Sequence, residues 1–284
     1  ADWHFMRGVP YLVRVQSGLL KPKSGRFGVD LAGVVEAVGS KVSEFKVGDE
    51  VFGQSRGALS EFVVATENSL AFKPSNLDFV QAASVPMAGF TAIQALRNKA
   101  GLKDGQSVLI VGASGGVGTF AVQIARVFGA SVTGVCSTGN LELVRSIGAN
   151  RLIDYTKEHF SSGFESYDVI VQTAGNYSLK QLRKVLASDG TLVVAGDSSG
   201  VKAVFGMRFI FRIIKSLVIT KFSNQKVPPF LAKSSKQDLV TLAKLIESTE
   251  IKPVIDRTYS MAQVAEAVAY LEAGHARGKV VITI

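Results

Sequence analysis

The pattern of apolar and polar positions changes character near residue 78. Before that point, short valine-rich stretches are separated by glycines, and we predict strands at 33–39, 47–53 and 61–65. Closely spaced short strands with glycine turns are typical of a small β-barrel or β-sandwich.

From residue 79 onward, apolar strands alternate with helices. After two helices at 79–84 and 89–98, the predicted strands are 107–111, 131–136, 151–153, 169–172 and 191–195, and the helices are 117–128, 141–147 and 178–186. Nearly continuous apolar strands separated by helices indicate a parallel sheet that is covered on both faces. We therefore predict a doubly wound α/β unit.

The end of the chain returns to β structure. A helix at 236–248 is followed by strands at 253–256 and 279–284, which flank a helix at 261–272. A chain that opens and closes with β segments around an α/β unit suggests one domain inserted into another.

Composition narrows the function classes. The 284 residues are 47% hydrophobic, which excludes a mainly disordered chain. A single cysteine, Cys136, excludes an internal disulfide and a zinc cluster of several thiolates, and it favours a reducing, cytoplasmic location. The chain starts without Met, so organelle targeting by a lost segment stays open.

The charge of the chain points to anionic partners. A net charge of +9 favours polyphosphate ligands, anionic surfaces or nucleic acid, and we expect no nucleic-acid partner because basic enzymes are common. The most membrane-like run, 203–222, contains four Lys and Arg residues, so we expect no transmembrane span. Residues 205–217 could form an amphipathic helix, which we interpret as a lid or wall of the substrate cleft or as part of a dimer contact; binding to an anionic membrane surface is the alternative.

A glycine-rich turn joins the strand 107–111 to the helix that follows it. Its residues are Gly112, Ala113, Ser114, Gly115, Gly116, Val117 and Gly118. In this context Gly112 permits a tight turn, Gly115 lets the backbone approach a pyrophosphate, and Gly118 lets the helix pack on the sheet. We therefore predict a dinucleotide site at the positive end of this helix.

The second strand of the unit indicates which dinucleotide is bound. An NAD site usually carries an acid after this strand, whereas here Ser137, Thr138 and Asn140 occupy the place. Hydroxyl and amide groups accommodate a 2′-phosphate that a carboxylate would repel, so NADPH is favoured over NADH. The same three residues also suit a helix cap, and both roles are compatible.

These motifs resemble the medium-chain dehydrogenase/reductase superfamily, and most closely its zinc-independent quinone oxidoreductase branch. The resemblance rests on the runs 33–39, 47–53, 113–118, 153–155 and 274–282 and covers essentially the whole chain. It implies a doubly wound Rossmann domain, residues 89–224, inserted into a GroES-like β-barrel domain, residues 1–88 and 225–284. Family members begin upstream of residue 2, so we expect the first barrel strands to be absent.

The resemblance also implies that no metal is bound. Zinc-dependent relatives carry a histidine ligand where this chain has Val29, and a cysteine-rich lobe where 54–60 contains no cysteine. Hydride transfer would then depend on the cofactor and on positioning.

Further cofactor contacts carried over from the family lie outside the glycine turn. They are Thr91 on the nicotinamide side, Tyr155 near the adenosine phosphate, Lys279 from the terminal strand, and Thr173, Ala174, Ala195 and Gly196 at strand ends. For most of these residues, ordinary packing within the protein is an equally good explanation as contact with the cofactor. The family often has a lysine just after the Ser-Thr pair, and this chain lacks it.

The expected activity is an NADPH-dependent reduction of quinones or α,β-unsaturated carbonyl compounds. His4 and Tyr11 stand near family tyrosines and are candidate proton donors, although solvent can also protonate a reduced quinone. The alternatives are a reductase of 2-alkenals or enoyl thioesters and a non-catalytic NADPH-binding protein. The resemblance implies a homodimer, and the helix at 205–217, if it lines the cleft, implies a small apolar substrate.

Overall fold

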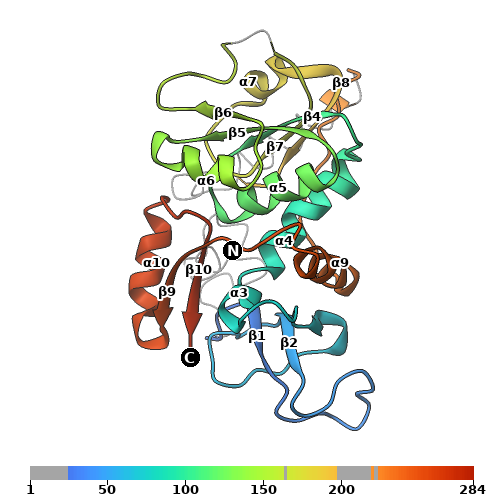
Figure 1. Ribbon diagram of the computed structural model, residues 1–284, viewed down its shortest axis with the longest axis vertical. Coiled ribbons are helices and arrows are strands. Elements are labelled where there is room, and N and C mark those ends of the chain that lie inside the picture. Colours follow the sequence, from blue (N-terminus) through green and yellow to red (C-terminus); the bar gives the residue numbers. More distant parts are fainter. Residues whose placement is uncertain (1–24, 163–164, 197–218, 221–222) are drawn as a thin grey trace.

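The computed structural model describes residues 25–162, 165–196, 219–220 and 223–284. The described chain forms an upper α/β part and a lower β-rich part, and helices α4 and α9 lie between them (Figure 1). The predicted proton donors His4 and Tyr11 and almost all of the basic-apolar run 203–222 lie outside the described residues.

The α/β part is built on a parallel five-stranded sheet. Its strand order is β6-β5-β4-β7-β8, in which the chain winds outward from β4 in both directions. The strands are β4 (Ser107–Val111), β5 (Ser131–Cys136), β6 (Arg151–Asp154), β7 (Tyr167–Gln172) and β8 (Leu186–Val194). This is the predicted doubly wound arrangement, and β4 and β7 flank the point at which the winding reverses.

Helices cover both faces of this sheet. The alternating side chains of β4 separate two cores: Val108 and Ile110 pack in the cluster that contains Phe120 of α5, and Leu109 packs with Leu182 of α7. The helices of this part are α5 (Gly116–Val127), the 3-10 helix η3 (Thr138–Asn140), α6 (Leu141–Ser146) and α7 (Leu179–Lys184). Burial on both faces explains why the strands are almost entirely apolar.

The β-rich part contains a small antiparallel sheet. It consists of β1 (Asp30–Val34), β2 (Glu50–Gln54) and β3 (Leu70–Phe72), which follows the short η1 (Glu67–Ser69). The strand predicted at 33–39 is wrong for most of its length, because the ladder ends at Val34. The strand predicted at 61–65 is also wrong: Phe62 and Val64 are exposed, and the segment forms no ladder with the described residues.

The C-terminal segment adds two further elements of β structure. Strand β9 (Ile255–Ser260) pairs in parallel with β10 (Lys279–Thr283), and η5 (Met261–Gln263) and α10 (Val264–Glu272) connect them. Strand β9 begins two residues later than predicted and extends beyond residue 256. Earlier in the chain, Lys226 forms a parallel bridge with Thr191 of β8, and Val227 lies in the core that contains Leu182 of α7.

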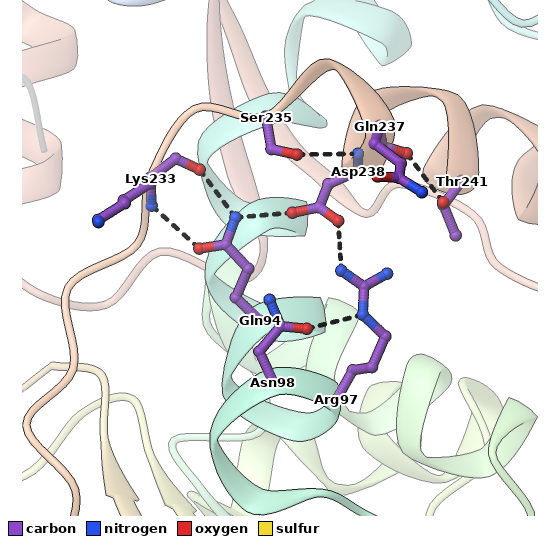
Figure 2. Close-up of polar contacts among 8 residues, drawn as sticks. All are labelled: Gln94, Arg97, Asn98, Lys233, Ser235, Gln237, Asp238 and Thr241. Carbon is purple, nitrogen blue, oxygen red and sulfur yellow. Dashed lines mark hydrogen bonds and ion pairs between the residues drawn. The ribbon is translucent and has the colours of Figure 1, made fainter.

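A polar cluster fixes the junction between the two parts (Figure 2). Helix α3 (Phe79–Ala83) precedes α4 (Pro86–Ile93), which continues into the π-helix η2 (Gln94–Ala100), and α9 is Lys236–Glu247. The buried carboxylate of Asp238 accepts hydrogen bonds from Gln94 Nε2 at 2.7 Å and Arg97 Nη2 at 2.5 Å. Gln94 also exchanges two hydrogen bonds with the backbone of Lys233. The returning chain is thereby tied to η2.

Candidate nucleotide-binding site

The predicted glycine turn lies between β4 and α5 at the carboxyl edge of the parallel sheet. Gly112 has φ +87°, a conformation that favours glycine, and its N–H and that of Ala113 donate to the carbonyl of Val135. The Ala113 side chain is buried in the core and faces Gly134 rather than solvent. Ala113 therefore shapes the turn through its backbone.

Two glycines of the turn are required by close packing. A Cβ on Gly112 would lie 2.7 Å from Cβ of Ala174 and 2.8 Å from Oγ1 of Thr173. A Cβ on Gly118 would overlap the carbonyl oxygen of Gly112 and lie 2.9 Å from Cα of Ala113. These positions hold the turn against β7 and hold the helix against the turn.

Gly115 is different, because the space beside it is open. It is the N-cap of α5 with φ −80°, and a Cβ there would have only the Gly112 oxygen nearby, at 3.5 Å. No side chain caps the helix. The N–H groups of its first turn, Gly116 to Gly118, have no acceptor within the helix. Free N–H groups at an uncapped helix start favour an anion.

The C-terminal segment runs beside this helix start. Gly278 forms a parallel bridge with Gly115, and a Cβ on Gly116 would lie 2.9 Å from Cδ of Lys279. The Lys279 ammonium, with its side chain 21% exposed, lies 3.7 Å from Oδ2 of Asp30. A cation is therefore held next to the uncapped helix N-terminus.

Asp30 connects this cation to the β-rich part. Besides Lys279, its carboxylate accepts hydrogen bonds from Gln54 Nε2 at 2.8 Å and from the Met87 N–H at 3.1 Å. On the same helix as Met87, the buried Thr91 donates its hydroxyl proton to the Met87 carbonyl at 2.7 Å. The Thr91 hydroxyl proton is thus used within α4.

Two of the predicted adenosine-side residues, Ser137 and Asn140, form one cluster with Ser114 of the glycine turn. The amide nitrogen of Asn140 donates to the hydroxyl oxygens of Ser114 and Ser137, both at 3.1 Å. Its carbonyl oxygen Oδ1 is buried and has no hydrogen-bond partner among the described residues. A buried acceptor of this kind is costly unless a donor reaches it.

Thr138 faces away from this cluster toward Asp154, the last residue of β6. Its hydroxyl donates to Asp154 Oδ2 at 2.5 Å, and the N–H and hydroxyl of Thr156 donate to Oδ1 at 3.0 and 2.7 Å. These hydrogen bonds, with a minor contribution from Lys157, lower the pKa of Asp154 to about 2. The hydroxyl proton of Thr138 is therefore donated to Asp154, and a contact between Thr138 and a dinucleotide stays a prediction.

The other predicted contacts surround the same edge. Thr173 donates to the carbonyl oxygens of Val111 and Gly112, and the N–H groups of Ala195 and Gly196 donate to the Gln172 carbonyl. Ala174 lies against Gly112, as described above. Tyr155 follows Asp154 with its side chain 53% exposed, and its N–H donates to the Cys136 carbonyl. The sheet brings these positions together with the glycine turn.

Sequence reasoning gave no role to three residues that the structure places here. Asp30 and Asp154 anchor predicted contacts from opposite sides of the site. Arg277 precedes the bridge residue Gly278, and its Nη2 atom would lie 3.4 Å from a Cβ on Gly139. Both Asp154 and Arg277 stand in motifs that carry the family resemblance, but their partners depend on how distant segments pair.

The described residues contain no group of three or more His, Cys, Asp or Glu side chains able to hold a metal ion. Within the same residues, no helix is long and apolar enough to cross a membrane.

Comparison with known proteins agrees with this architecture. Residues 1–75 match the alcohol dehydrogenase GroES-like domain, and residues 147–282 match the zinc-binding dehydrogenase family. The chain is 39% identical to the 2-methylene-furan-3-one reductase of Solanum lycopersicum, covering 90% of this chain and 62% of that protein. It is 37% identical to the mitochondrial NAD(P)H oxidoreductase RTN4IP1 of Bos taurus, with 90% and 70% covered. The chain belongs to the medium-chain dehydrogenase/reductase superfamily, in its quinone oxidoreductase-like branch.

A solved structure of this superfamily has the same fold. The quinone oxidoreductase from Coxiella burnetii superposes with a TM-score of 0.83 and 28% identity, covering 100% of this chain and 86% of that one. The predicted Rossmann and GroES-like architecture is thereby confirmed. The chain spans less than two thirds of the tomato reductase, so the activity of the whole protein is a proposal.

Proposed function

We propose that the protein is an NADPH-dependent, zinc-independent oxidoreductase that transfers hydride to quinones or α,β-unsaturated carbonyl compounds. The observation that carries this proposal is the uncapped start of α5, where Gly115 leaves open space and Lys279 adds a positive charge. Backbone donors, a helix dipole and a cation together suit a pyrophosphate.

Different residues of the site would bind the pyrophosphate, the adenosine and the nicotinamide of the dinucleotide. The N–H groups of Gly116 to Gly118 and the Lys279 ammonium would hold the pyrophosphate. On the adenosine side, Ser137 and Asn140 would contact the ribose and its 2′-phosphate, and Tyr155 would lie against the adenosine. Thr173, Ala174, Ala195 and Gly196 would line the opposite side toward the nicotinamide, together with Thr91. When bound, the nicotinamide supplies the hydride.

The substrate class is supported by the names of the relatives. A quinone and a 2-methylene-furan-3-one share a carbon made electron-poor by conjugation to a carbonyl, which accepts hydride. The absence of zinc is proposed from Val29, which replaces the histidine of zinc-dependent relatives. His4 and Tyr11 stay predictions as proton donors, because they lie outside the described residues.

The division into residues 1–88 and 225–284 and residues 89–224 also stays a prediction. The same holds for the homodimer and the cytoplasmic location, which come from the resemblance and from the cysteine content.

The proposal is tested by cofactor titration followed by hydride transfer. We expect NADPH to bind more tightly than NADH, and NADPH carrying deuterium at C4 to transfer that deuterium to the β-carbon of an enone. In a second assay, an apolar quinone should be reduced with matching oxidation of NADPH. Tight NADPH binding without turnover on either substrate would instead support a non-catalytic NADPH-binding protein.

A matched pair of variants tests the location of the site. Gly115→Asp places a carboxylate in the open space and should repel the pyrophosphate, whereas Gly115→Asn adds a side chain of similar size without the charge. We expect the Asp variant to bind either nucleotide more weakly than the Asn variant. Equal affinities in the two variants would contradict a pyrophosphate at this position.

A further inference from the structure

The segment before β10 brings a second cation to the site. The backbone N–H of Arg277 donates to Asp256 Oδ2 at 2.9 Å, and the Tyr270 hydroxyl donates to the same oxygen at 2.7 Å. Gly278, the next residue, forms the bridge to Gly115. Arg277 is thus fixed between two anchors and is close to the start of α5.

The guanidinium of Arg277 extends over the turn that follows β5. Its Nη2 atom would be 3.4 Å from a Cβ on Gly139, the residue between Thr138 and Asn140. Among the described residues, the guanidinium has no hydrogen-bond or ion-pair partner, and the residue is exposed. The tripeptide Arg277 to Lys279 therefore places one cation at the glycine turn, Lys279 beside Gly116, and a second at the turn after β5, Arg277 beside Gly139.

The two carboxylates near this turn already accept hydrogen bonds from other partners. Asp154 accepts hydrogen bonds from Thr138 and Thr156, and Asp256 accepts them from Tyr270 and from the Arg277 backbone. The partly buried amide of Asn140 and the hydroxyl of Ser137 lie beside Gly139. The Arg277 guanidinium beside the Asn140 amide and the Ser137 hydroxyl is a suitable environment for a phosphate group.

We propose that Arg277 binds the 2′-phosphate of NADPH and sets the preference for NADPH over NADH. This inference rests on the proposed function. The guanidinium offers paired donors that match two phosphate oxygens, a geometry that a hydroxyl or amide cannot provide. It would supply, from a segment 138 residues beyond Gly139 in sequence, the charge that a lysine near the Ser-Thr pair supplies in relatives.

The test measures binding of nucleotides that differ by one phosphate. Calorimetric titrations compare NADPH with NADH, and adenosine 2′,5′-bisphosphate with adenosine 5′-monophosphate, for the wild-type chain and Arg277→Gln. We expect Arg277→Gln to weaken the two 2′-phosphorylated ligands by about 10- to 100-fold, as for loss of a hydrogen bond to a charged group. Affinity for the two other ligands should be unchanged.

Two variants control for charge and folding. Arg145→Gln removes the same charge from the exposed face of α6, where Arg145 pairs with Glu142 at 3.0 Å, and it should leave the preference intact. Arg277→Lys keeps the charge without the paired donors and should have intermediate affinity. Thermal melting checks that Arg277→Gln is folded.

The outcomes separate this inference from the proposed function. If the wild-type chain binds neither NADPH nor NADH, the proposed function fails and the role of Arg277 fails with it. If the wild type prefers NADPH and Arg277→Gln keeps that preference, only the role of Arg277 is overturned. Equal weakening of NADPH and NADH would assign Arg277 to the pyrophosphate or to the fold, and would also overturn the inference.

Discussion

Replacing each of two neighbouring glycines with alanine should separate cofactor binding from stability. At Gly115, φ is −80° and an added methyl group meets only the Gly112 oxygen, at an ordinary contact distance of 3.5 Å. At Gly118, the same methyl group overlaps that oxygen and lies 2.9 Å from the backbone of Ala113. We therefore expect Gly115→Ala to act on the ligand and Gly118→Ala to act on the fold.

The expected magnitudes differ accordingly. Gly115→Ala loses a few tenths of a kcal/mol as a poorer N-cap and regains a similar amount through the lower entropy of its unfolded state, so its net stability change is close to zero. Gly118→Ala forces the backbone of the turn to move, and such overpacking costs about 1–3 kcal/mol. For a chain of this size, that loss lowers the melting temperature by roughly 2–10 °C.

Differential scanning fluorimetry and NADPH titration on the two purified variants measure both effects. Gly115→Ala should melt near the wild-type temperature and bind NADPH and NADH about 10- to 100-fold more weakly, because its methyl group occupies the space for the phosphate. Wild-type affinity in Gly115→Ala would refute the assignment of that space. A Gly118→Ala variant with unchanged melting temperature would refute the packing argument.

Three further predictions concern stability and reactivity. Asp238→Asn should lower the free energy of unfolding by about 1–3 kcal/mol, because it weakens the hydrogen bonds to Gln94 and Arg97 at a buried carboxylate, and urea denaturation measures this. Hydrogen bonds lower the pKa of Asp154 from 3.8 to about 2, so its stabilising contribution is complete above pH 4 and disappears as the pH falls through 2. Melting curves between pH 5 and 2 should therefore be flatter for Asp154→Asn than for the wild type, and parallel curves would contradict this. Burial and the charge of Asp154 raise the pKa of the Cys136 thiol to about 11, so iodoacetamide at pH 8.5 should modify it only after denaturation.

The α/β part of the fold could be predicted closely because its sequence signals are redundant. Strands β4 and β5 have the predicted bounds, since each is an apolar run buried on both faces that ends at a glycine or a polar turn. In the β-rich part, several apolar residues are exposed, so an apolar position does not indicate a buried strand there. Val34 is 54% exposed and Phe62 is 73% exposed, so alternation there extended the predicted strands beyond the ladder.

Strand β9, in contrast, extends further than the sequence predicts. Asp256, Arg257 and Thr258 make it polar, and it is held by parallel pairing with β10 rather than by an apolar face. Pairing with a strand more than 20 residues away is not visible in local periodicity. The prediction therefore captured only the apolar beginning of this region.

The candidate site likewise has a part that the sequence predicts and a part that it does not. The glycine turn could be predicted because strand, turn and helix are consecutive and each glycine has a local steric reason. Thr138 shows the limit: its residue type suits a phosphate, but strand order places Asp154 beside Cys136, and the carboxylate takes the hydroxyl proton. Which donors are free depends on neighbours that only the sheet topology supplies.

The order of the chain also explains why the cations of the site come last. A glycine turn at a helix N-terminus supplies donors but no full charge, and a dinucleotide phosphate brings at least one negative charge that must be balanced. The sheet-and-helix unit contributes Ser137 and Asn140, which are neutral, and its acid Asp154 is already bonded. The cations come from the C-terminal segment: Arg277 precedes β10, and Lys279, the first residue of β10, pairs with Asp30 of β1. Because β1 and β10 come from opposite ends of the described chain, the charged part of the proposed nucleotide site would form only when the β-rich part is folded against the α/β part.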